Sequence, residues 1–96
     1  MAQLNINYVE TKNTGVAVVN QATDFKRLLG EIKTLNSNLK TYWQGDDATT
    51  YTSRVDDQAI TMDSLGQKIE DIGNFLQQVG KAYEDAMGAN RDALNK

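Results

Sequence analysis

The residues most capable of chemistry in this chain are four pairs of adjacent carboxylates. They are Asp46-Asp47, Asp56-Asp57, Glu70-Asp71 and Glu84-Asp85. Two carboxylates that face one site can serve acid–base catalysis or hold a hard metal ion. Neighbours on a helix point in different directions, so none of these pairs forms a catalytic dyad by itself. We interpret the first pair as the opening of a helix and the others as a solvated face, and we expect no enzyme, no metal site and no cofactor.

The residue types that usually carry catalysis are missing as well. The 96 residues include no histidine and no cysteine. This removes the commonest general base, the commonest metal ligand and any disulfide. The net charge is −3, and the only basic cluster is Lys26-Arg27, so we expect no binding of nucleic acid.

The chain has no proline, which suits long helices, because proline breaks a helix interior. Its length allows one small domain, residues 1–96. No apolar stretch is long enough to span a membrane. The N-terminus also lacks the basic and apolar regions of a Sec-type signal peptide, and composition alone would therefore place the protein in the cytoplasm.

The stretch Trp43-Gln44-Gly45 stands between two helical patterns and holds the only tryptophan. Glycine adopts the left-handed backbone past a helix end without steric cost, and aspartate is favoured where a helix begins. The sequence predicts an all-α fold: a helix over about 8–43, a turn over 43–46, a helix over about 47–88 and a loose tail over 89–96. Asn7, with Glu10 three residues later, is the predicted N-cap of the first helix.

Apolar residues recur at alternating three- and four-residue spacings in both helices, a pattern that we call the seam. A period of 3.5 residues is typical of helices that pack along their length. Only Gln58 interrupts the seam of the second helix. The principal seam residues are Phe25, Leu28, Ile32, Leu35 and Leu39 in the first helix and Met62, Leu65, Ile69, Ile72, Leu76 and Val79 in the second.

Two further patterns bear on how the helices pack. Gly66, Gly73 and Gly80 lie seven residues apart, either as a smooth strip that another helix approaches closely or as incidental glycines on a solvent face. Val19, Leu29, Ile60 and Phe75 fall outside the seams, which favours a second hairpin and a four-helix bundle unless they are scattered surface residues.

The charges of the two arms are opposite. Residues 1–45 carry five basic and three acidic side chains, whereas residues 46–96 carry five basic and ten acidic ones. Opposite charge favours pairing of the arms, with little stability from each exposed ion pair.

The whole chain resembles the WXG100 (ESAT-6-like) family. The resemblance rests on Trp43 and Gly45 at mid-chain, followed by Ala48 and Tyr51 at the family's small and aromatic positions, and on a length near one hundred residues. It implies a two-helix antiparallel hairpin and an antiparallel dimer with itself or a related WXG protein. It also implies secretion through a type VII (ESX-like) system and its ATPase, without a cleaved signal peptide, after folding in the cytoplasm.

One family feature is incomplete. The family's export signal pairs the W-x-G turn of one protomer with a C-terminal tyrosine of the other, which is followed four residues later by an acid. Tyr83 is suitably placed, but Met87 stands at the acidic position and Asp85 lies two residues after the tyrosine. Either Tyr83 and Asp85 form a degenerate export signal, or the protein is exported with a partner that supplies the signal. Tyr83 is alternatively a seam residue only.

Several functions remain open at this point. The first is a non-enzymatic protein that is itself a type VII substrate. The second is a small partner that pairs with a larger secreted effector and carries it to the export machine. A third is a cytoplasmic coiled-coil adaptor whose W-x-G is only a turn. A fourth is membrane action after release, which no feature of the sequence favours.

Overall fold

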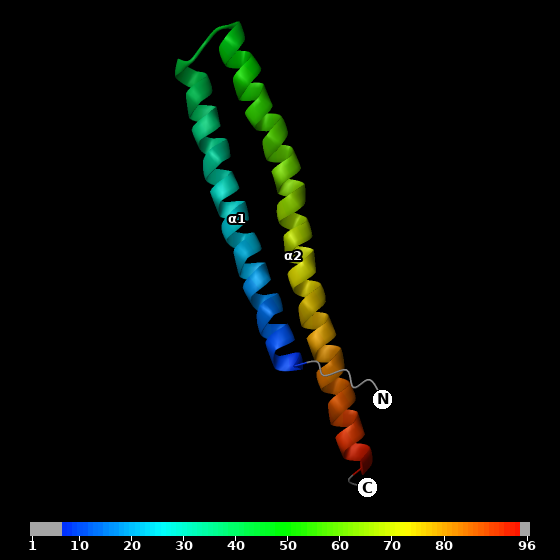
Figure 1. Ribbon diagram of the computed structural model, residues 1–96. Helices are drawn as coiled ribbons and strands as arrows, with labels where there is room; N and C mark the ends of the chain where they lie inside the picture. Colours follow the sequence, from blue (N-terminus) through cyan, green and yellow to red (C-terminus); the bar gives the residue numbers. More distant parts are fainter. Residues whose placement is uncertain (1–6, 95–96) are drawn as a thin grey trace.

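The computed structural model describes residues 7–94, and the side chains of residues 7–88. Two helices make up this part of the chain, α1 (Tyr8–Tyr42) and α2 (Asp46–Leu94), and they lie side by side as an antiparallel hairpin (Figure 1). The molecule measures 76 × 22 × 14 Å. The predicted all-α hairpin is confirmed.

The helix ends follow from local hydrogen bonds. The Asn7 side chain accepts a hydrogen bond from the Glu10 amide at 3.1 Å, as expected for the N-cap of α1. The second helix continues to Leu94, past the predicted end near residue 88. No proline interrupts residues 89–94, and alanine and leucine are good helix formers, so the helix has no local reason to stop earlier.

The two helices meet along one buried stripe in each helix, made mostly of small residues that repeat every seven positions. In α1 the buried residues are Gly15, Ala22, Leu29 and Asn36. In α2 they are Thr52, Ala59, Gly66, Gly73 and Gly80, with Ala48 beside the turn. The glycine strip therefore marks a close helix approach rather than a solvent face: a Cβ atom built on Gly73 would lie 2.8 Å from the carbonyl oxygen of Gly15.

The seam residues lie beside this contact and not at its centre. Each seam position stands three residues after, or one residue before, a residue of the buried stripe, which places the seams of both helices on one side of the hairpin. Leu35 is 66% exposed and Ile72 56% exposed. The hairpin core is thus narrower than a fully interdigitated coiled coil, because the backbones of glycine and alanine pack closer than leucine side chains allow.

The apolar residues outside the seams differ in how far they are buried. Leu29 is buried in the hairpin and needs no second hairpin to cover it, whereas Ile60 is 68% exposed and Phe75 is also exposed. Gln58, the one polar residue in the seam of α2, is exposed to solvent in the single hairpin. The polar residues that the hairpin buries are Asn36 and Thr52.

Candidate interaction surface

The turn between the helices forms an aromatic corner. Trp43 caps the C-terminus of α1, where its amide donates to the Leu39 carbonyl oxygen at 2.9 Å. Gly45 has a φ of 122°, a conformation that side-chain-bearing residues rarely adopt. Its carbonyl oxygen accepts the first hydrogen bond of α2 from the Thr49 amide at 3.0 Å. The structure therefore has the predicted order of a helix end, a turn and a new helix. Gly45 is the N-cap of α2, and Asp46 lies in its first turn.

The aromatic rings of the corner lie together and stay accessible. The rings of Trp43 and Tyr51 are stacked, with centroids 5.9 Å apart and an interplanar angle of 15°. Trp43 is 38% exposed and the adjacent Tyr42 is 74% exposed. Ala48, in the first turn of α2, is buried beside the corner.

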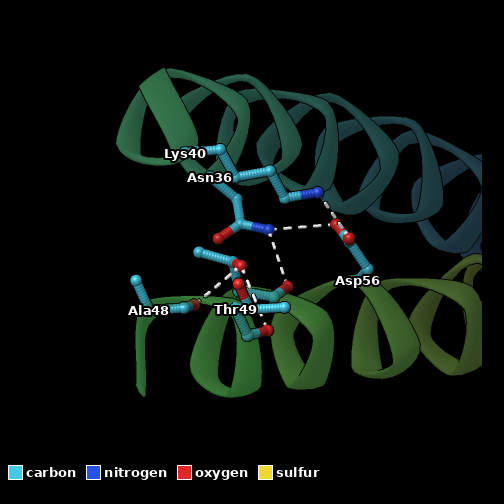
Figure 2. Close-up of polar contacts among 6 residues, drawn as sticks. Asn36, Lys40, Ala48, Thr49 and Asp56 are labelled. Atoms are coloured by element: carbon cyan, nitrogen blue, oxygen red, sulfur yellow. Dashed lines mark hydrogen bonds and ion pairs between the residues drawn. The ribbon is translucent and has the colours of Figure 1, made fainter. Parts of the chain in front are cut away.

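A polar cluster holds the helices together next to this corner (Figure 2). The buried amide of Asn36 donates to the Thr52 carbonyl oxygen and to the Asp56 carboxylate, both at 3.0 Å. The Lys40 ammonium donates to the other oxygen of Asp56 at 2.6 Å. The pKa of Asp56 is lowered from 3.8, mainly by the hydrogen bond from Lys40. Desolvation raises the pKa and opposes this effect. The charge of Lys40 and the hydrogen bond from Asn36 lower the pKa further.

Four ion pairs between the helices define a charged face. They are Lys12–Glu84, Lys26–Glu70, Lys33–Asp63 and Lys40–Asp56. Apart from Lys12, every member stands four residues after a residue of the buried stripes, on the side of the contact opposite the seams. The opposite charges of the two arms are therefore paired within one hairpin.

The side away from these ion pairs is the apolar face, made by the seam residues of both helices. Toward the corner this face is hollowed into a groove of about 400 Å³ between the helices. The groove is lined by Leu29, Ile32, Tyr51, Arg54, Val55, Gln58, Ala59 and Met62. One side of the hairpin is thus charged and internally paired, and the other is apolar and uncovered.

A family comparison agrees with the corner and the hairpin. The family model WXG100, described as proteins of 100 residues with WXG, matches residues 3–86. The chain belongs to the WXG100 family. Proteins of this family are in general small, non-enzymatic helical proteins secreted by type VII systems, and they generally form dimers with WXG partners. No curated protein and no solved structure matches the chain.

The remaining predicted site residues lie far from the corner of this WXG100 protein. Tyr83 is half-buried, and Asp85 is exposed beside Lys81, whose ammonium lies 3.4 Å from its carboxylate. Met87 is also exposed. Tyr83 lies 37 residues after the start of α2 at Asp46, which is about 56 Å along the helix. One chain therefore does not bring Tyr83 and Trp43 together.

Sequence reasoning missed the polar cluster and the full extent of the small-residue stripe. The signal was present: Gly15, Ala22, Leu29 and Asn36 repeat at the same seven-residue interval as the three glycines of α2. Within residues 7–94 no group of three or more possible ligands could hold a metal ion. The same part of the chain contains no helix that is long and apolar enough to cross a membrane.

Proposed function

We propose that this WXG100 protein is a non-enzymatic substrate of a type VII secretion system, exported as a dimer of helical hairpins. The apolar face is the dimer interface, and the Trp43 corner is part of the signal that the secretion ATPase reads. The protein folds in the cytoplasm and leaves the cell without a cleaved signal peptide. Its partner is a second copy or a related WXG protein.

The observation that carries this proposal is the one-sided hairpin. Each helix pairs its charges with the other helix on one face, while large apolar side chains such as Leu28, Leu35 and Ile72 stay exposed on the other. Contiguous exposed apolar surface marks interaction sites. The chain exposes 7386 Å², against about 5,500 Å² expected for a compact monomer of this mass. A standard interface removes roughly 800 Å² from each partner.

The corner suits recognition by another protein, because the Trp43 side chain packs on a neighbouring ring and is also accessible to solvent. Trp43 rests on Tyr51 and still exposes part of its ring. A stacked aromatic pair contributes about 0.5–1.5 kcal/mol beyond its buried area. Replacing Trp43 by alanine is therefore expected to leave a folded hairpin that has lost its recognition element.

A second candidate function is export partner of a larger effector. Met87 stands where the family's C-terminal motif has an acid, and Asp85 faces Lys81 on its own helix. A protein with an incomplete signal would rely on a partner chain for the missing part. This function predicts that export requires a neighbouring gene product, and co-expression of the neighbouring genes tests it.

An export assay in a host with a working type VII system tests the proposal. It compares wild type, Trp43→Ala and wild type in a strain that lacks the secretion ATPase, with a cytoplasmic marker to exclude lysis. Tyr42→Ala is the matched control, because it removes an exposed aromatic next to Trp43. Wild type and the control are expected in the medium, and the other two samples inside the cells. Retention of all samples, with neighbouring genes co-expressed, would instead indicate a cytoplasmic adaptor.

A further inference from the structure

The Trp43 side chain has one stacked neighbour and open space beside it. Its ring lies against the ring of Tyr51, with centroids 5.9 Å apart and an interplanar angle of 15°. Trp43 also borders a hollow of about 350 Å³, which is lined otherwise by polar residues and glycine, among them Gln44, Thr49 and Ser53. An indole beside a hollow has room to turn, so its orientation depends on the stacked contact with Tyr51.

Tyr51 is not part of the contact between the two helices. It lies in the second turn of α2 and is 55% exposed. The next residue, Thr52, belongs to the buried stripe, and its carbonyl oxygen accepts the hydrogen bond from the Asn36 amide at 3.0 Å. Replacing Tyr51 by another good helix former is therefore expected to leave the hairpin folded.

Tyr51 also belongs to a second surface. Its side chain lines the apolar groove of about 400 Å³, and so does Val55, which lies one helical turn further along α2. The proposed function places a partner chain on the apolar face that holds this groove. A partner side chain that enters the groove would then contact the ring that supports Trp43.

We propose that Tyr51 is the positioning residue of the corner. Its ring fixes the orientation of the Trp43 indole, and a partner chain that packs into the groove beside Tyr51 stabilises this stack further. The energy of one aromatic pair favours the stacked arrangement only about two- to tenfold, so added packing on Tyr51 has a large effect on the order of the indole. The inference rests on the proposed function for the partner and for export, and it adds the residue that connects the two surfaces.

The fluorescence of Trp43 tests the positioning role, because this is the only tryptophan in the chain. Tyr51→Leu removes the ring but keeps an apolar helix former, and Tyr51→Phe keeps the ring. Tyr51→Leu is expected to lower the stacked fraction of Trp43 about two- to tenfold, measured as faster quenching by acrylamide and lower anisotropy. Tyr51→Phe should match wild type, and so should the control Tyr42→Leu, which removes the exposed neighbouring ring.

Folding of each variant is followed by far-ultraviolet circular dichroism at one protein concentration. If Tyr51→Leu stays helical and its Trp43 is quenched as slowly as in wild type, the positioning role is wrong. If Tyr51→Phe loosens the indole as much as Tyr51→Leu does, the stack is not what holds the indole, and the proposal fails as well.

A second measurement tests the connection between the groove and the corner. Val55→Phe places a ring in the groove one turn from Tyr51, as a substitute for a partner side chain. It is expected to slow the quenching of Trp43, and this effect should vanish when Val55→Phe is combined with Tyr51→Leu. Ile60→Phe is the control, since Ile60 is 68% exposed and does not line the groove. Equal effects of Val55→Phe and Ile60→Phe, or an effect that persists with Tyr51→Leu, would overturn the connection.

Export separates this inference from the proposed function. If both are correct, Tyr51→Phe is exported like wild type, and Tyr51→Leu is retained like Trp43→Ala. Export of Tyr51→Leu at the wild-type level, with Trp43→Ala retained, would overturn the positioning role and leave the proposed function intact. A wild type that is never exported, but whose Trp43 loosens on Tyr51→Leu, would support the positioning role and refute the proposed function.

Discussion

Replacing Gly73 by alanine is expected to destabilise the hairpin although alanine is the better helix former. Alanine gains about 1 kcal/mol over glycine inside a helix. At Gly73 the added Cβ atom would lie 2.6 Å from the Val19 Cγ2 atom and 2.8 Å from the Gly15 carbonyl oxygen. Ordinary contacts between such atoms are about 3.5–4.0 Å. One of these neighbours is backbone, so the helices must move apart.

The matched control is Gly30→Ala. Gly30 is an exposed helical glycine of α1, and an added Cβ atom there would meet nothing within 4 Å. This variant therefore shows the gain in helix propensity alone, about 0.5–1 kcal/mol. Overpacking of a close contact costs about 1–3 kcal/mol. Because the propensity gain is common to both variants, their free energies of unfolding should differ by about 1–3 kcal/mol, with Gly73→Ala the less stable.

Thermal unfolding followed by circular dichroism measures this difference. For a domain of this size, 1 kcal/mol corresponds to about 4–8 °C in Tm. The variants are compared at one protein concentration, since self-association stabilises the folded state. Gly66→Ala should fall between the two, because its nearest neighbour at 3.1 Å is a Phe25 ring atom that can shift. A Gly73→Ala melting temperature at or above that of Gly30→Ala would refute the close helix contact.

Three further predictions concern the corner and its polar cluster. Asn36→Ala is expected to lower the free energy of unfolding by about 1–3 kcal/mol, because a buried amide that donates to Thr52 and Asp56 is lost; an unchanged urea midpoint would contradict this. Because the pKa of Asp56 is lowered, its bond to Lys40 stabilises the fold fully above the unfolded pKa, and this stabilisation is lost as pH falls through the lower pKa of the folded state. Lys40→Met should therefore lower the urea midpoint at pH 7, and the difference from wild type should shrink as pH falls from 3.8 through the lowered pKa of Asp56; a constant difference across this range would exclude the linkage. Gly45→Ala should cost about 1–3 kcal/mol in urea unfolding through its φ of 122° alone, since nothing lies within 4 Å of the added atom; a stability equal to wild type would show that the turn relaxes.

The corner could be predicted in detail from the sequence because its causes are local. A helix end, a positive φ and a helix start each depend on a few neighbouring residues. Trp43 is the C-cap of α1, and Gly45 takes the positive φ of the turn, as the sequence predicts. The same holds for the N-cap at Asn7, whose hydrogen bond spans three residues.

The contact between the helices could not be assigned in the same way. A seven-residue repeat runs through the seams, the lysines of α1 and the small residues alike, so periodicity alone leaves several stripes that could face the other helix. The seam was the natural choice, because large apolar residues bury the most surface. In the hairpin the small residues meet instead, and the lysine–carboxylate pairs occupy one flank.

The sequence by itself determined two long helices, their turn, the exclusion of histidine and cysteine chemistry, and the resemblance to the family. Each of these follows from residue types or from short-range spacing. Only the tertiary structure decided which stripe is buried, because that depends on how closely two backbones can approach across the hairpin. The close contact at Gly15 and Gly73 leaves the large seam residues on one uncovered face. The surface proposed to bind a partner is therefore a consequence of packing between residues distant in the sequence.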